Sequence, residues 1–329
     1  MVRLGLKSLS AFATCVALIA AGTSVTRSQE RTQPKPSSDR AQTSQTSKSA
    51  IDPMLEIQIL LDRAGFSPGE IDGVDGGNTK KAIAAFESTH GLAGGDRAAL
   101  LQALNRGAAE VLASYTITAE DVAGPFTPSI PTDLMEQSKL DALNFTSVIE
   151  ALGETFHCSP NVLRRLNPGA RFEEGETIRV PDVSGGQPPA APGNVKVVVS
   201  KDASVATVYA SDGKVIFHAP VTSGSEHDPL PLGSWVVTAV IKNPTFNYNP
   251  DLFWDANPSH AKAKIPPGPN GPVGIVWIDI SKEHYGLHGT PEPSQIGHTS
   301  SHGCVRLTNW DAARLAALVT KGTPVLFEQ

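Results

Sequence analysis

A short segment rich in glycine, proline and alanine, SGGQPPAAPGN at residues 184–194, divides the chain into two parts. Such a composition is typical of a linker. Before it, apolar residues recur at helical spacing. After it they alternate with polar residues, which is typical of strands. The division predicts a largely helical N-terminal part and a mostly β domain at residues 195–329.

The C-terminal part carries several strand patterns and one helical pattern. Asp212-Gly213 separates two of the strand patterns and is typical of a hairpin turn. NWDAARLAALVTKG predicts one helix near the C-terminus, followed by a last strand in TPVLFEQ. We expect one sheet with one helix packed on it. Strands are predicted in VKVVVS, VATVYA, KVIFHAPV, SWVVTAV and VGIVWIDI.

The first 26 residues have the pattern of an export signal. Arg3 and Lys7 precede the apolar run LSAFATCVALIAAG, which is short for a membrane span of ~20 residues. Residues 27–50 are rich in Ser, Thr, Gln and Pro and predict a disordered tether. The protein is therefore expected to be exported to the periplasm or cell wall, with the N-terminal segment either cleaved or retained as a membrane tether.

Residues 51–108 predict a small bundle of three helices. PMLEIQILLDRAG, NTKKAIAAFESTHG and DRAALLQALNRG each end in the glycine that commonly stops a helix. The string LLDRAGFSPGEIDGVDGGNTKKAIAAFE resembles the peptidoglycan-binding three-helix repeat. The resemblance rests on turn residues and on residues of the second helix: Gly65, Gly69, Asp72, Gly73, Thr79, Ala82 and Phe86.

Residues 109–183 predict a second small module that combines strands and helices. SVIEALGETFHCSPNVLRRLNPGARFEEGETIRVP contains a good helix start at Ser159-Pro160. The segment resembles a LysM module, through Leu-Asn-Pro at 166–168 and the pattern Gly175, Ile178, Val180 and Pro181. The resemblance implies either binding to N-acetylglucosamine chains or a scaffold role.

The string HTSSHGCVRL at 298–307 concentrates the reactive side chains of the chain. Cys304 is a nucleophile only as a thiolate, and a neighbouring imidazole can take its proton. His302 is two residues away, on the same face of an extended segment. His288 comes from a separate segment and can direct its ring across at the sulfur. We therefore expect His288 to be the general base, with His302 as an auxiliary group.

The residues around the thiol suggest further roles. Gly303 permits a tight turn, so that the amides of Gly303 and Cys304 can stabilise an oxyanion. Ser301 can bond an imidazole or a substrate amide. The guanidinium of Arg306 suits a substrate carboxylate.

The sequence leaves two other interpretations of Cys304 open. In an exported protein it can pair with Cys158 in a disulfide, although Cys158 is expected to be a small buried apolar residue. A zinc site is the second alternative, but the paired ligand spacing of such sites is missing. We expect neither a metal nor a cofactor. In the zinc alternative, the ligands would be His288, His298, His302 and Cys304.

The motifs His288-Gly289-Thr290 and Ser301-His302-Gly303-Cys304-Val305-Arg306 resemble those of the L,D-transpeptidases of the YkuD type. Pro231, Gly233 and Trp235 match an upstream segment of the same family. The resemblance implies that Cys304 attacks, that His288 is the base, and that the main chain around Gly289 orients its ring. Thr290 and Arg306 are expected on the substrate side.

The resemblance also implies a substrate and an inhibitor class. A peptidoglycan tetrapeptide stem would lose its terminal D-alanine, form a thioester and pass to an amine of a neighbouring stem or of a wall-attached protein. Carbapenems would acylate Cys304. The alternatives are transfer to water by the same site, as in a carboxypeptidase or endopeptidase, and a non-catalytic wall-binding protein. A net charge of −6 and 6% aromatic residues exclude nucleic acid as a partner, and the chain shows no nucleotide site.

Overall fold

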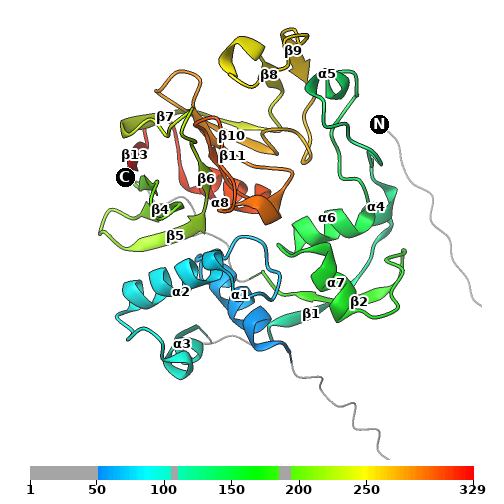
Figure 1. The fold of residues 1–329 in the computed structure, drawn as a ribbon. Coiled ribbons are helices and arrows are strands. Elements are labelled where there is room, and N and C mark those ends of the chain that lie inside the picture. Colours follow the sequence, from blue (N-terminus) through cyan, green and yellow to red (C-terminus); the bar gives the residue numbers. More distant parts are fainter. Residues whose placement is uncertain (1–50, 105–109, 185–193) are drawn as a thin grey trace, which may run out of the picture. The chain divides into compact units, whose positions relative to one another are not determined.

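The computed structural model describes residues 51–104, 110–184 and 194–329 (Figure 1). The expected signal segment, 1–26, and the tether, 27–50, lie outside the described residues. None of the helices in the described part has both the length and the hydropathy needed to cross a bilayer. The described residues belong to one compact unit, Ala50–Gln329.

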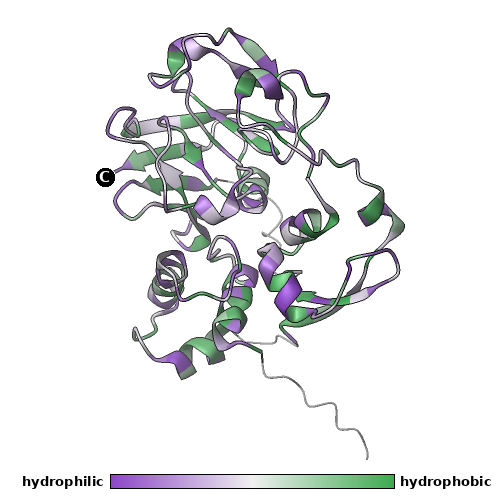
Figure 2. Ribbon diagram, turned by 45° about the vertical axis from the view of Figure 1, so that its right-hand side comes forward, coloured by the Kyte–Doolittle hydropathy of each residue, from purple (hydrophilic) through white to green (hydrophobic). Residues whose placement is uncertain are grey.

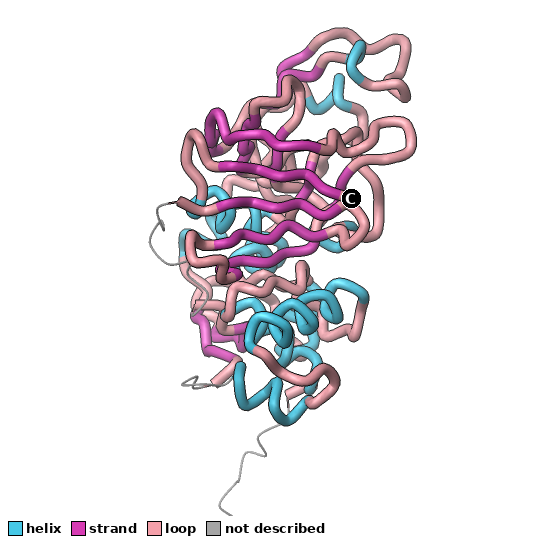
Figure 3. Tube along the Cα trace, turned by 90° about the vertical axis from the view of Figure 1, so that its left-hand side faces the viewer, coloured by secondary structure: helices cyan, strands magenta, loops and turns pink. Residues whose placement is uncertain are grey.

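The alternating segments after residue 194 form a mixed sheet of nine strands (Figure 3). The strand order is β5-β4-β3-β13-β7-β10-β11-β12-β6. Only the pairs β3–β13 and β11–β12 are parallel within this sheet. The bounds are β3 Lys196–Ser200, β4 Val205–Tyr209, β5 Val215–Pro220, β6 Thr222–Ser223, β7 Gly233–Lys242, β10 Val276–Ile280, β11 Gly286–His288, β12 Val305–Arg306 and β13 Pro324–Glu328.

Helix α8, Asn309–Leu318, packs on this sheet, as the sequence predicts. Thr308 caps it by accepting a hydrogen bond from the amide of Asp311. Its buried Leu315 joins a core that includes Phe217 and Phe327 from the strands. The strands carry many hydrophobic residues among polar ones (green and purple in Figure 2), and the buried apolar residues of the strands and of α8 form one core.

Several short elements were not predicted. Strands β6, β11 and β12 have two or three residues each, too few for an alternating pattern. A separate hairpin pairs β8, Phe246–Tyr248, with β9, Ala263–Ile265. Two turns of 3-10 helix are η1, Pro250–Leu252, and η2, Pro293–Gln295.

The predicted three-helix bundle is present as α1 Pro53–Arg63, α2 Gly77–His90 and α3 Arg97–Leu104. Its own core contains Ile57 and Leu61 of α1 packed with Phe86 of α2. On another face of α1, Leu55 and Ile59 join the core of the following module. A helix with apolar residues on more than one face needs neighbours on each of them. Helix α1 therefore packs against the other helices of its bundle on one face and against the following module on another.

The following module has the expected order of a strand, two helices and a strand. β1, Leu112–Thr116, pairs antiparallel with β2, Thr177–Pro181, and the helices are α6, Val148–Thr155, and α7, Pro160–Leu166. Cys158 is buried in its core, as predicted. The connection from β1 to α6 carries two short helices, α4 Ala119–Ala123 and α5 Leu134–Gln137. The LysM relationship itself stays a prediction.

One buried carboxylate joins the three predicted modules. Asp62 of α1 accepts two hydrogen bonds from the Arg314 guanidinium of α8, at 2.7 and 2.8 Å. The Nδ1 atom of His157, between α6 and α7, lies 3.1 Å from the same carboxylate. Burial opposes the charge of Asp62, but His157 and Arg314 hold its pKa well below the usual range. Asp62 is therefore an ionised, fully paired group in the interior.

We expect Asp62→Ala to lower the free energy of unfolding by roughly 3–5 kcal/mol, because Arg314 then stays buried without its partner. Denaturant unfolding measures this loss. Asp75→Ala is the matched control, since Asp75 forms an exposed pair with Lys80 at 3.9 Å and such pairs contribute about 0–1 kcal/mol. Similar unfolding curves for the two variants would contradict the structural role of Asp62.

Candidate active site

The candidate base lies on β11, and the candidate nucleophile directly precedes the adjacent parallel strand β12. The register of β11 and β12 pairs Leu287 with Val305 and His288 with Arg306. Cys304 directly precedes β12, two residues before Arg306. Residues two apart share a face of an extended chain, and in-register neighbours in a sheet point to the same side. The register therefore puts His288 and Arg306 on one face, and Cys304 enters this pair of strands directly before Val305.

Cys304 is half-buried and is a free thiol. Its Sγ lies 3.7 Å from the carbonyl oxygen of His284, to which the S–H can donate. Burial raises the pKa of the thiol, while the backbone amide of Gly286 and the charge of Arg306 oppose this shift. The resting group is therefore a thiol that needs a base.

His288 has the environment of a neutral imidazole. It is 4% exposed, and its Nδ1 lies 2.7 Å from the carbonyl oxygen of Gly289. A carbonyl only accepts, so Nδ1 carries the proton and Nε2 has a free lone pair. Burial and, second, the charge of Arg306 lower the pKa of His288 to about 4, against the raising effect of the Gly289 bond. Trp277 stacks on the ring at 5.4 Å between centroids.

The hydroxyl of Ser301 holds the main chain around the nucleophile. It donates to the carbonyl of Cys304 at 2.5 Å and accepts from the amides of Gly224 and Gly303 at 2.8 and 3.2 Å. One donor and two acceptor positions are thereby used. Ser301 thus has main-chain partners instead of the expected imidazole or substrate amide. Its hydroxyl also accepts from the Gly303 amide, which was expected to stabilise an oxyanion.

Gly303 is required by the path of the chain. Its φ is +96°, and a Cβ atom here would lie 2.5 Å from the Tyr285 ring. A side chain is therefore excluded both by the backbone conformation and by its neighbour. Tyr285 has a raised pKa, owing to burial first and to the nearby Cys304 and Asp228. The sequence motif gave no indication of Tyr285.

The imidazole of His302 contacts Asp255 and not the Cys304 sulfur. Its Nε2 lies 2.9 Å from Oδ1 of Asp255, and its ring meets the edge of Phe253 at 5.1 Å. Both partners lie between β8 and β9. Next to them, Trp254 is 61% exposed and stacks on His227 at 4.3 Å. In this structure His302 thus contacts the hairpin segment, and its auxiliary role stays a prediction.

The remaining motif residues are Gly289, Thr290 and Arg306, and each has a different environment. A Cβ atom on Gly289 would lie 2.2 Å from Oδ1 of Asn309, the first residue of α8. Thr290 is buried, and its Oγ1 accepts from the amide of Glu292 at 3.2 Å. Burial lowers the pKa of Arg306, against the effects of Cys304 and Glu292. Asn309, which the sequence motifs do not include, explains why residue 289 is a glycine.

The two alternative interpretations of Cys304 find no support in the geometry. Cys158 and Cys304 are both free, and Cys158 is buried in the core of another module. Within residues 51–104, 110–184 and 194–329, no three or more His, Cys, Asp or Glu residues form a group that could hold a metal ion. His298 is an exposed loop residue.

Two family models match parts of this chain. The L,D-transpeptidase catalytic domain, YkuD, matches residues 194–326, and a peptidoglycan-binding domain matches residues 52–94. The putative L,D-transpeptidase YkuD of Bacillus licheniformis is 28% identical over 180 residues, which cover 54% of this chain and 91% of that protein. The putative L,D-transpeptidase YqjB of Bacillus subtilis is 30% identical over 141 residues, which cover 41% of this chain and 72% of that protein.

Among solved structures, an L,D-transpeptidase from Mycobacterium smegmatis aligns with 24% identity and a TM-score of 0.34. The alignment covers 41% of this chain and 59% of that one. With its YkuD-type catalytic domain and a peptidoglycan-binding domain before it, the chain belongs to the L,D-transpeptidase family.

Proposed function

We propose that the protein is a cysteine-dependent acyltransferase that acts on peptidoglycan stem peptides. Membership of the L,D-transpeptidase family supports the reaction class. The register of β11 and β12 is the observation that supports the mechanism, because it brings the segments that carry His288 and Cys304 side by side. No cofactor is required, since the energy of the cleaved amide bond is kept in the thioester.

The proposed acylation starts with proton transfer from the Cys304 thiol to Nε2 of His288. The thiolate attacks the carbonyl carbon that precedes the terminal D-alanine of a tetrapeptide stem. When the tetrahedral intermediate collapses, the C–N bond breaks, and the D-alanine nitrogen takes the proton from His288. A thioester on Cys304 and free D-alanine result.

In the second half, an amine of a neighbouring stem attacks the thioester carbonyl. His288 accepts the amine proton and returns it to the departing sulfur, which restores the thiol. The product is a crosslink between two stems, and an amine on a wall-attached protein is a second acceptor. Arg306 and Thr290 lie beside the site and would bind the substrate, with the guanidinium of Arg306 suited to a carboxylate.

The other modules and the N-terminus fit a substrate outside the cell membrane. The peptidoglycan-binding domain at 52–94 would hold the wall polymer, and the 109–183 module would bind glycan strands or act as a scaffold. Residues 1–26 would direct export to the periplasm or cell wall. Fractionation of cells that express the tagged full chain tests this location, and retention of the chain in the cytoplasm would exclude it.

A hydrolase that uses water as acceptor would work with the same residues. We expect purified enzyme and disaccharide-tetrapeptides to yield 3–3 crosslinked dimers together with released D-alanine, as measured by mass spectrometry. Tripeptides without dimers would favour a carboxypeptidase, and cleavage of existing crosslinks would favour an endopeptidase. Unchanged tetrapeptides combined with binding to sacculi would favour a non-catalytic wall-binding protein.

A further inference from the structure

Trp277 of β10 lies beside the candidate base on the same face of the sheet. The register of β10 and β11 pairs Trp277 with His288, and residues paired in this way have neighbouring side chains on one side. The two rings stack at an angle of 20°, with their centroids 5.4 Å apart. Since His288 is 4% exposed and Trp277 is half-buried, the indole shields one face of the imidazole from water.

Gly286 leaves the space that this position of the indole requires. A Cβ atom on Gly286 would lie 2.6 Å from Cζ2 and 2.8 Å from Cε2 of Trp277. A larger residue would therefore displace the ring. The backbone amide of Gly286 also donates a hydrogen bond to the Cys304 sulfur. The indole thus lies across the strand that carries both the base and a main-chain partner of the nucleophile.

Asp279 fixes the indole in this position. Nε1 of Trp277 donates to Oδ1 of Asp279 at 3.2 Å. The other carboxyl oxygen, Oδ2, accepts from the hydroxyl of Thr238 on the neighbouring strand β7. Asp279 lies opposite Gly286 in the register of β10 and β11. The hydrogen bond therefore directs the indole toward the space above Gly286.

The bond to Asp279 determines which neighbouring strand the indole meets. On the opposite side, the register of β10 and β7 pairs Trp277 with Ile241, which is 45% exposed. A large ring reaches side chains on either neighbouring strand. With Nε1 held at Asp279 the ring stays stacked on His288, and without that bond it is free to turn toward Ile241.

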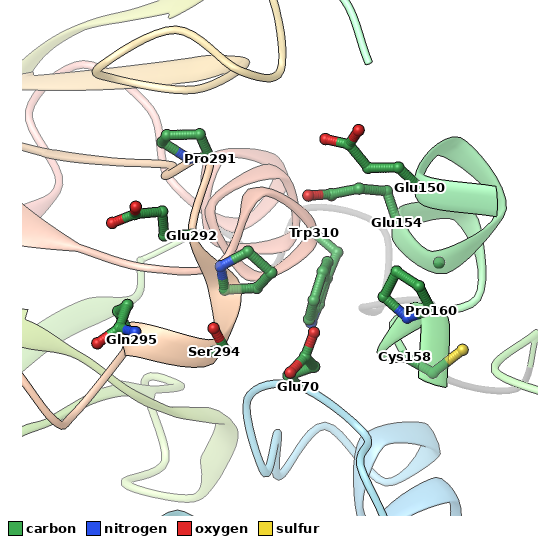
Figure 4. Close-up of a pocket in the computed structure, with 12 residues that line it drawn as sticks. Glu70, Glu150, Glu154, Cys158, Pro160, Pro291, Glu292, Ser294, Gln295 and Trp310 are labelled. Carbon is green, nitrogen blue, oxygen red and sulfur yellow. The ribbon is translucent and has the colours of Figure 1, made fainter. Parts of the chain in front are cut away.

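A second tryptophan shows the difference between an indole held by burial and one held by a hydrogen bond. Trp310 of α8 lies at the cavity of about 250 Å³ drawn in Figure 4, where it is 6% exposed and stacks on His157 at 5.3 Å between centroids. Its Nε1 has no hydrogen-bond partner in the described residues, so close packing fixes this ring. Trp277 is more exposed, and its fixed position depends on Asp279.

The electrostatics of His288 depend on this cover. Burial is the main cause of the lowered pKa of His288, and the charge of Arg306 on β12 is the second. The elements packed against it also carry the Cys304 thiol, directly before β12, the Asp279 carboxyl on β10 and the uncharged Asn309 of α8. Without the indole, water would reach the imidazole and stabilise its charged form.

We propose that Trp277 and Asp279 are positioning residues for the base. The carboxyl group of Asp279 holds the indole, and the indole keeps the His288 ring in its orientation and excludes water from one of its faces. Both residues act through His288, and neither takes part in bond formation. The inference rests on the proposed role of His288 as general base in the acylation of Cys304.

Nuclear magnetic resonance of the full chain with isotopically labelled histidine tests this role without a measurement of activity. The spectra report the pKa and the tautomer of each imidazole, and the signals of His288 are those absent from His288→Gln. In the wild type we expect a pKa of about 4 and a proton on Nδ1. In Trp277→Ala the pKa of His288 should rise toward the ordinary value of ~6.5, because water reaches the ring. An unchanged pKa would overturn the proposal.

Trp235→Phe is the matched control for this measurement. Trp235 is also a half-buried tryptophan of the sheet, and its Nε1 donates to the carbonyl oxygen of Pro231 at 2.9 Å. It lies in the part of β7 that pairs with β13 and not with β10. The pKa of His288 should therefore be the same in Trp235→Phe and in the wild type. A rise of similar size in both tryptophan variants would show that the effect is not specific to Trp277, and would count against its role.

Two substitutions of Asp279 separate its hydrogen bond from its charge. Asp279→Asn keeps an oxygen that accepts from Nε1 of Trp277, whereas Asp279→Leu keeps the size but has no acceptor. Both remove a negative charge, and this change alone would lower the pKa of His288. We therefore expect a higher pKa of His288 in Asp279→Leu than in Asp279→Asn. Equal values in the two variants would refute the role of Asp279.

Acylation kinetics separate this inference from the proposed function. Trp277→Ala and Asp279→Leu should lower the maximal single-turnover rate of acylation by a carbapenem by roughly 10–10²-fold, the cost of a misplaced catalytic group, with little change in the half-saturating concentration. The acid limb of the rate should move from a pH of about 4 toward ~6.5. A wild type that forms no adduct on Cys304 would contradict the proposed function. A normal wild-type adduct, together with unchanged rates and acid limbs in both variants, would contradict the positioning role alone.

Discussion

Cys304→Ala is expected to abolish D-alanine release and crosslinking, with a loss in kcat on the order of 10⁶-fold. The methyl group of alanine cannot form the thioester, and no other group in the site replaces the sulfur. Release of D-alanine from tetrapeptide stems measures the loss. Incubation with a carbapenem followed by intact-mass spectrometry is the second measurement, and the adduct seen on the wild type should be absent from the variant.

Cys158→Ala is the matched control for this prediction. Cys158 is 2% exposed, and burial together with Glu70 raises the pKa of its thiol far above the usual range, so that it is inert as a nucleophile. This variant should keep its turnover and its carbapenem adduct. Sacculus binding should survive in both variants, because the peptidoglycan-binding domain is distant in sequence from Cys304. Undiminished turnover of Cys304→Ala would remove the basis of the mechanism.

The long periodic segments could be predicted from the sequence, and the short catalytic strands could not. Strands such as β4 and β5, the three helices of 51–104 and helix α8 all follow from apolar spacing and from helix-ending residues. Strands β11 and β12 are too short for a pattern, and their parallel pairing depends on chain segments between them. The residue types in the two motifs thus predict a thiol nucleophile and an imidazole base. The strand register that brings the two motifs side by side could be seen only in the structure.

The partners of the motif side chains were equally hidden from the sequence. Ser301 uses its hydroxyl on the main chain, and His302 meets Asp255, which lies far from it in sequence. Such contacts depend on loop geometry, which apolar periodicity does not encode. The double role of α1 was also missed: the helical pattern is visible, but its second apolar face could be assigned to a neighbouring module only in three dimensions.

His288→Ala is expected to lower the acylation rate by roughly 10²–10⁴-fold, the usual contribution of a positioned general base. The ring is fixed for this task, because Nδ1 bonds to the Gly289 carbonyl and Trp277 covers its face. Single-turnover acylation by a carbapenem or a stem peptide measures the step directly. His302→Ala is the matched comparison. Since His302 forms a partly exposed pair with Asp255, its loss should cost no more than about tenfold.

The pH profile of acylation separates a neutral resting pair from a charged one. The pKa of His288 is lowered to about 4, so the base form is present above that pH, while burial keeps the Cys304 thiol protonated. The wild-type rate should therefore show no acid limb until pH approaches 4, and should stay level above it until the thiol begins to ionise, because the neutral base and the thiol are both in their reactive forms over that range. A resting imidazolium–thiolate pair would instead show thiolate ultraviolet absorbance at neutral pH. Because His288→Ala removes only the base, its residual rate should follow the ionisation of the thiol alone, with a steeper rise toward alkaline pH than in the wild type.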